Sequence, residues 1–123
     1  MRFITPYKRA HDLGAARRGT AEHVALSTSG WALAIIVPVF VFILARTLGS
    51  GFEGVRATFS NPFVAIVTAL FLVVGLLHFA RGARTPIEDY TRGFLTEALI
   101  LIAGGIAWAL MATGLYALAR LAL

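Results

Sequence analysis

The stretch from Asn61 to Ala80 decides the fold, and it reads NPFVAIVTALFLVVGLLHFA without a charged side chain. A helix rises about 1.5 Å per residue, so this run is long enough to cross the roughly 30 Å of hydrocarbon in a bilayer. A single apolar segment in lipid satisfies its backbone hydrogen bonds only as a helix. The run therefore predicts a transmembrane helix, and Pro62 suits its first turn.

Two further uncharged runs flank this one, from Ser27 to Ala45 and from Ala98 to Ala119. The runs are continuous rather than alternating, which excludes a β-barrel. We therefore expect an all-α integral membrane protein with a tail over residues 1–26 and a three-helix membrane anchor over residues 27–123. The predicted spans cover residues 27–48, 61–84 and 95–119.

Composition excludes several other classes of protein. Hydrophobic residues make up 59% of the chain and charged residues 14%, against about 45–50% and about 25% in soluble domains. The chain has no cysteine, so it offers neither disulfides nor thiolate ligands for a metal or an iron–sulfur cluster. The net charge of +5 comes from basic residues that flank the apolar runs, which favours a membrane surface and no nucleic acid.

The distribution of Lys and Arg predicts the orientation of the three spans. Eight of the eleven lie in the tail and in the connection after the second span, and three lie on the other side. Cytoplasmic loops carry the excess of positive charge. We therefore expect a cytoplasmic N-terminus and a periplasmic C-terminus.

The connections also carry signals for where helices end. Gly49-Ser50-Gly51 is a helix stop, and Pro38 inside the first span should kink that helix or be absorbed by its neighbours. Thr85-Pro86-Ile87-Glu88 has the pattern of a capping box. The sequence therefore predicts a break near Pro86, followed by a new helix that leads into the third span.

His78 is the most informative residue because polar side chains inside membranes are rare and tend to be functional. Gly75, His78 and Gly82 share one helical stripe, with spacings i, i+3 and i+7. An interfacial histidine beside ordinary packing glycines is one interpretation. The other is a histidine that ligates a haem lodged in the glycine recess. With no second histidine in any span, another chain would then supply the opposite axial ligand.

Two other features have both a structural and a functional interpretation. Asp89 and Tyr90, just beyond the second span, would suit a quinone headgroup, or they would serve the helix dipole and an aromatic belt. Gly105, Ala109 and Thr113 form a small-residue ridge with Gly104 beside it. Such a ridge allows close helix contact, within the chain or with a partner.

These residues together resemble the small hydrophobic anchor subunit of succinate dehydrogenase (respiratory complex II), of the three-helix type found in alphaproteobacteria. The resemblance covers nearly the whole chain. It is carried by a basic tail, three spans and the motifs Leu13-Gly14-Ala15-Ala16-Arg17-Arg18-Gly19-Thr20, His23, His78-x-x-x-Gly82 and Ile87-Glu88-Asp89-Tyr90.

The resemblance implies a specific role for several of these residues. His78 would be an axial ligand of a b-type haem shared with the partner anchor, and Gly75 and Gly82 would face that haem. His23 and Arg81 would lie near its propionates. Tyr90 would donate a hydrogen bond to ubiquinone, with Asp89 in the same region.

The resemblance also implies the setting in which the chain works. The chain would be a non-catalytic subunit of a quinone-dependent oxidoreductase in the bacterial inner membrane. Its partners would be a flavoprotein, an iron–sulfur protein and a second membrane anchor, which would complete a larger helical bundle. The complex would take part in electron transport, as a member of the tricarboxylic acid cycle and the respiratory chain.

The sequence departs from the family pattern at two places. Many members have an arginine where this chain has Ser27-Thr28-Ser29. The positive charge that pairs with the haem propionates would then come from another chain, from Arg81 or from Arg84. A break at Pro86 would reorient Tyr90. Two rival hypotheses remain: an anchor that serves assembly without haem, and a small transporter or channel subunit. The second is disfavoured because no acid or arginine lies inside a span.

Overall fold

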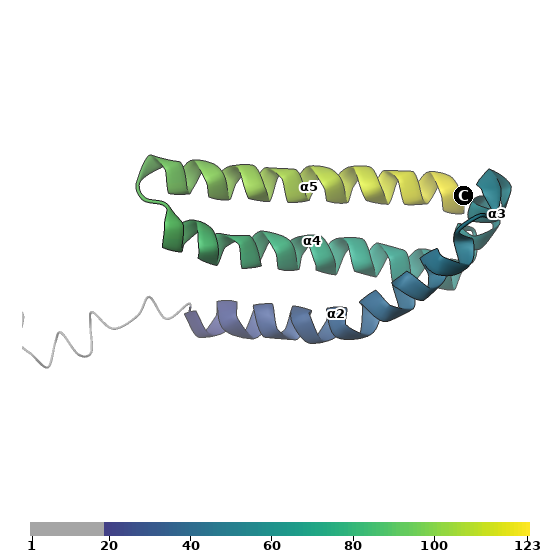
Figure 1. Cartoon of the computed structure of the whole chain (residues 1–123), viewed down its shortest axis with the longest axis horizontal. Coiled ribbons are helices and arrows are strands. Elements are labelled where there is room, and N and C mark those ends of the chain that lie inside the picture. Colours follow the sequence, from purple (N-terminus) through teal and green to yellow (C-terminus); the bar gives the residue numbers. More distant parts are fainter. Residues whose placement is uncertain (1–18) are drawn as a thin grey trace, which may run out of the picture.

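The structure is a computed structural model that describes residues 19–123, so most of the basic tail, including Leu13 to Arg18, lies outside it. Its helices are α2 (Gly19–Thr47), α3 (Gly51–Phe59), α4 (Pro62–Tyr90) and α5 (Phe94–Ala122). Figure 1 shows the three long helices side by side, with the short α3 at the end that holds the C-terminus. All three long helices are long and apolar enough to cross a membrane, which confirms the predicted fold class.

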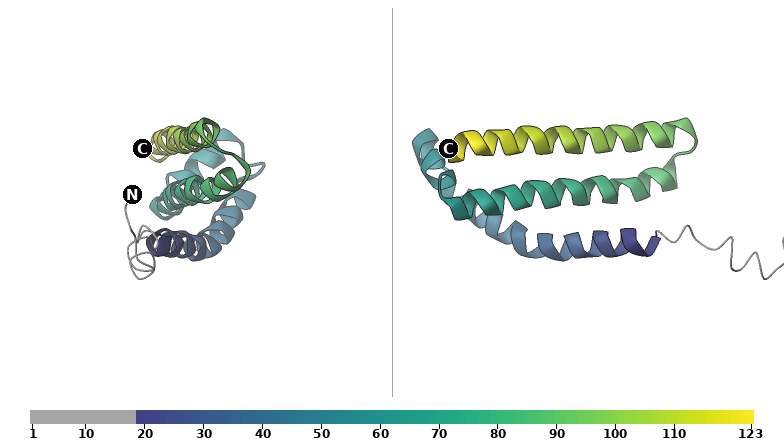
Figure 2. Two further views of the ribbon diagram at one scale, coloured as in Figure 1. Left: turned by 90° about the vertical axis from the view of Figure 1, so that its left-hand side faces the viewer. Right: turned by 180° about the vertical axis from the view of Figure 1, so that it is seen from behind.

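Helix α4 lies in the middle and packs against α2 on one side and α5 on the other. Within the described part of the chain, α2 and α5 do not pack against each other. The end-on view in Figure 2 shows the same order, with α4 between the other two. Each of the two interfaces of α4 therefore has its own chemistry.

The interface between α4 and α5 is closely packed. A Cβ built at Gly114 of α5 would lie 3.1 Å from Cδ1 of Leu72, so only glycine fits there without a shift of the leucine. Ala107 and Met111 of α5 are both buried. The small-residue ridge of Gly105, Ala109 and Thr113 is exposed instead, so this chain does not use it for internal packing.

Most large apolar side chains point away from the bundle. Trp31 is 77% exposed and Ile35 is 72% exposed, although both lie inside the apolar run of α2. In water such surfaces would be costly, but against hydrocarbon or another apolar helix they are not. The exposed surface therefore agrees with a helix layer that lipid and other subunits cover.

The helix boundaries at the α3 end follow the sequence signals. The Asn61 side chain accepts a hydrogen bond from the Phe63 backbone N–H, and Pro62 occupies the first turn of α4. Helix α2 ends at Thr47, and Gly49 follows with a φ of 82°, a value that glycine adopts easily. The short α3 was not predicted.

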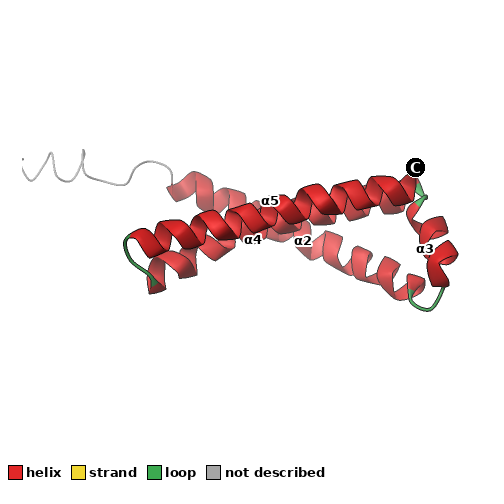
Figure 3. Ribbon diagram, turned by 90° about the horizontal axis from the view of Figure 1, so that it is seen from above, coloured by secondary structure: helices red, strands yellow, loops and turns green. Residues whose placement is uncertain are grey.

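Helix α2 runs unbroken through Pro38 but changes direction along its length (Figure 1). Seen from above, its second half diverges from α4 and α5 (Figure 3). Proline has no backbone N–H and its ring displaces the carbonyl four residues earlier, so it is the usual cause of such a bend. The change of direction agrees with the predicted kink, and α2 remains one helix.

The predicted break near Pro86 is wrong. Helix α4 continues through Pro86 to Tyr90, and Thr85 lies inside the helix rather than capping a new one. Instead of closing a capping box, Glu88 accepts a hydrogen bond of 2.7 Å from Arg84, one turn earlier. This pair spans the proline, and the chain turns only beyond Thr91, where Gly93 has a φ of 64°.

Candidate functional site

His78 points into the interface between α4 and α2, where it meets Ser29. The Nδ1 atom of His78 lies 2.8 Å from the Ser29 hydroxyl oxygen, and that hydroxyl lies 2.8 Å from the backbone carbonyl of Leu26. This contact joins α2 and α4 through two residues that lie 49 positions apart in the sequence. His78 is therefore held in one orientation by α2.

The predicted glycine stripe lies along the same interface. A Cβ at Gly75 would lie 3.8 Å from Leu33, and one at Gly82 would lie 4.0 Å from Leu26. On the opposing helix, a Cβ at Gly30 would lie 3.6 Å from Cε1 of His78. Glycines from both helices thus leave space around the imidazole, and leucine side chains of α2 line the stripe.

A cavity of about 480 Å³ opens between the first turns of α2 and the last turns of α4. This volume is within the range of about 300–1,000 Å³ typical of ligand sites. Two of the predicted site residues, His23 and Arg81, lie on its wall. Its full lining is Glu22, His23, Leu26, Arg81, Arg84, Thr85 and Glu88. Because Leu26 both lines the cavity and accepts the Ser29 hydrogen bond, the cavity adjoins the His78 contact.

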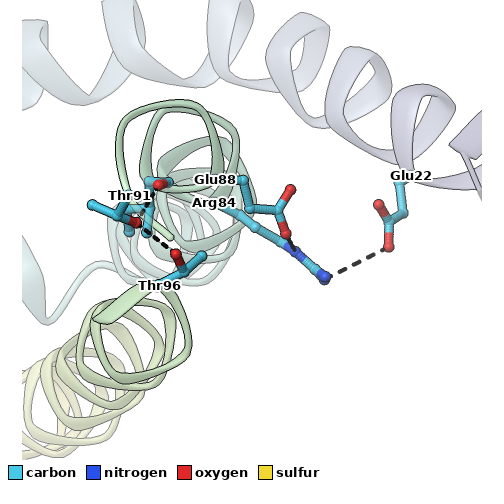
Figure 4. A network of polar contacts seen from close by, with 6 residues as sticks. Glu22, Arg84, Glu88, Thr91 and Thr96 are labelled. Carbon is cyan, nitrogen blue, oxygen red and sulfur yellow. Dashed lines mark hydrogen bonds and ion pairs between the residues drawn. The ribbon is translucent and has the colours of Figure 1, made fainter. Parts of the chain in front are cut away.

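The two arginines of the cavity differ in their partners. Arg84 lies between two carboxylates, 2.7 Å from Glu88 and 3.9 Å from Glu22 (Figure 4). Within residues 19–123, Arg81 forms no ion pair. Among the described residues, the charge of Arg84 is therefore paired, while that of Arg81 is available to an anion.

Asp89 and Tyr90 are not brought together with His78. They end α4 outside the cavity, and Tyr90 is 90% exposed. Beyond them, the Thr91 hydroxyl donates to the carbonyl of Ile87 and accepts from the hydroxyl of Thr96 on α5, 2.9 Å away (Figure 4). The helix end that carries the phenol is thus fixed to α5, while the phenol itself is open.

Sequence comparison identifies the family of the chain. Residues 1–119 match the family described as "Succinate dehydrogenase/Fumarate reductase transmembrane subunit". A protein of Paracoccus denitrificans, "Succinate dehydrogenase hydrophobic membrane anchor subunit", is 43% identical over 123 residues, which are 100% of this chain and 95% of that protein. The chain belongs to the succinate dehydrogenase membrane anchors.

Membership of this family fixes the broad role of the chain. It is an integral membrane anchor of the succinate dehydrogenase complex, it is non-catalytic on its own, and it works with the other subunits of that complex. No solved structure matches the chain.

Proposed function

We propose that this anchor supplies one axial histidine, His78, to a b-type haem shared with a partner anchor, and that it forms part of a ubiquinone-reduction site. The observation that carries the proposal is the fixed imidazole of His78 beside a cavity that holds Arg81, which has no ion-pair partner among residues 19–123. A purely structural anchor needs neither feature.

The residues around His78 suit a haem. One ring nitrogen, Nδ1, is engaged by Ser29, which leaves Nε2 for iron. Metal-ligating histidines usually hold their second nitrogen in a hydrogen bond of this kind. Gly75 and Gly82 leave the helix surface bare near the ring, and the leucines opposite them would move aside to admit a planar group. A haem bound there would take up and return one electron.

The cavity suits the polar edge of that haem. Propionates are carboxylates, and Arg81 and His23 can donate hydrogen bonds to them from α4 and α2. Arg84 is a weaker candidate because its guanidinium group already forms ion pairs with Glu88 and Glu22. Arg81 therefore takes the role that the missing arginine near Ser29 has in many family members.

Tyr90 and Asp89 suit a quinone site completed by other subunits. A phenol can donate a hydrogen bond to a quinone carbonyl oxygen as negative charge develops there. The adjacent carboxylate can accept a proton and return it. Because Tyr90 is exposed in the isolated chain, the flavoprotein, iron–sulfur and second anchor subunits have room to cover it.

The charge distribution supports a location and an orientation. The end of α4 and the loop to α5 lie at the same end of the bundle as the start of α2 (Figure 1). By sequence position, the end of α4 carries Arg81 and Arg84, the loop carries Arg92, and the basic tail precedes α2. The positive-inside rule assigns that end to the cytoplasm of a bacterial inner membrane. The cavity and Tyr90 would then face the peripheral subunits that deliver electrons.

Optical spectra of the purified complex test the haem ligand. In His78→Ala, we expect loss of the reduced b-haem bands with the flavin content of the complex retained. His11→Ala is the matched control, because it removes an imidazole from the tail rather than from a predicted span. It should leave the bands unchanged. Unaltered bands in His78→Ala would overturn the proposal.

Activity assays test the quinone site separately. Tyr90→Phe should slow ubiquinone reduction by about 10-fold to about 150-fold, because a hydrogen bond to a charged group contributes about 1.5–3 kcal/mol. Succinate oxidation with an artificial acceptor should stay near the wild-type rate. Tyr116→Phe, which removes an exposed phenol from α5, is the control. An equal loss of both activities would indicate an assembly defect instead.

A further inference from the structure

We infer that Ser29 is a positioning residue for the haem: its hydroxyl selects the tautomer of His78 that presents Nε2 to iron. The inference deepens the proposed function and depends on it, because it assigns a role to the residue that contacts the proposed ligand. Its basis is the pair of hydrogen bonds made by one hydroxyl group.

The proton count at Ser29 determines the direction of both bonds. A serine hydroxyl has one proton to donate and two lone pairs to accept with. The Leu26 carbonyl can only accept, so the hydrogen bond of 2.8 Å to it uses the hydroxyl proton. The contact of 2.8 Å with Nδ1 is then formed by the N–H of His78 donating to Ser29.

This direction leaves the lone pair of the neutral ring on Nε2. The two tautomers of a free histidine differ little in energy, and the hydrogen bond at one nitrogen decides which nitrogen can bind a metal. Ser29 itself cannot swing to the other arrangement without losing its bond to Leu26. The serine thus prepares the ligand atom before haem arrives, and the bare surface of Gly30 next to it leaves room for the ring.

The same hydrogen bond would tune the iron. An acceptor on Nδ1–H raises the basicity of the imidazole and so its donation to the metal. Stronger donation favours the ferric state, so removal of the acceptor should shift the midpoint potential of the haem to more positive values. A residue that only packs between helices would not alter the potential in this direction.

The test compares Ser29→Ala and Ser29→Thr in the purified complex. Haem loss to a haem-scavenging protein should be about 10-fold faster in Ser29→Ala than in the wild type, the lower limit usual for removal of such partners. In the same variant, the midpoint potential of the haem should rise, and the g values of the ferric haem should change. Ser29→Thr keeps the hydroxyl and should restore all three. Ser27→Ala is an exposed control on the same helix and should match the wild type.

The outcomes separate this inference from the proposed function. If His78→Ala loses the haem bands while Ser29→Ala keeps the wild-type loss rate, potential and g values, the role of Ser29 is wrong and the ligand stands. If His78→Ala keeps the bands, the proposed function fails first. Should Ser29→Ala not assemble, Ser29→Cys keeps the side-chain size with a weaker acceptor and should give an intermediate loss rate; a wild-type rate there would overturn the inference.

Discussion

The two interfaces of α4 differ in what fills them. Toward α5 the interface is apolar and closely packed, with Gly114 against Leu72 and with Ala107 and Met111 buried. Toward α2, the end near Tyr90 has a hydrogen-bonded imidazole and a cavity with charged walls. The other end of that same interface is packed, with the rings of Phe40 and Phe71 stacked 4.1 Å apart.

Under the proposed function, this difference separates support from ligand binding. The α5 interface and the Phe40–Phe71 end hold the helices at a fixed spacing, while the polar end has a cavity that adjoins the His78–Ser29 contact. A closed core there would exclude a ligand.

Overfilling the α5 interface should cost the most stability. Gly114→Val places methyl groups where a single Cβ already lies 3.1 Å from Leu72, so we expect a loss of about 1–3 kcal/mol. The yield and thermal stability of the complex should fall, while the haem spectrum of the assembled fraction stays unchanged. Gly105→Val is the control, because nothing lies within 4 Å of a Cβ there. Equal stability of the two variants would contradict the close packing.

At the polar end, the two arginines should differ in effect. Arg81→Gln should weaken haem retention by up to about 6-fold, since an exposed charge pair contributes about 0.2–1 kcal/mol. It should also lower the midpoint potential, because a nearby positive charge favours the reduced haem. Arg84→Gln should change both less, as Glu88 and Glu22 already neutralise that arginine. The reverse order would refute the assignment of Arg81.

The smallest effect is expected at Pro86. Helix α4 already continues through this residue, so Pro86→Ala should leave ubiquinone reduction within about 2-fold of wild type. It should raise the stability of the helix rather than lower it, because alanine restores the backbone N–H that proline lacks. Steady-state quinone assays check the rate of reduction. A large loss of quinone reduction alone would mean that the proline sets the position of Tyr90.

The sequence was sufficient to predict the spans, because in lipid a single uncharged run such as Asn61–Ala80 satisfies its backbone hydrogen bonds only as a helix. It was also sufficient for the start of α4, where Pro62 occupies the first turn as expected. It failed at Pro86 because a capping pattern says nothing about competing contacts, and the Arg84–Glu88 pair supports the helix across the proline. The short α3 was missed because its nine residues lie between the helix stop at Gly49-Ser50-Gly51 and the helix start at Asn61-Pro62.

The candidate site was only partly predictable. His78, His23 and Arg81 could be chosen from residue type and spacing, but their partners depend on how α2 and α4 align. Ser29 lies near the start of the first predicted span and His78 near the end of the second, so equal depth in antiparallel helices would have paired them. The network of Glu22 with Arg84 gave no such signal, because Glu22 was assigned to the tail.

A density map of the assembled complex would show which ring nitrogen of His78 faces the haem iron. We predict a porphyrin between this anchor and its partner, with Nε2 of His78 on the iron and Nδ1 on the Ser29 hydroxyl. A map in which the His78 ring faces acyl chains, or in which other residues fill both axial positions of the iron, would contradict the account.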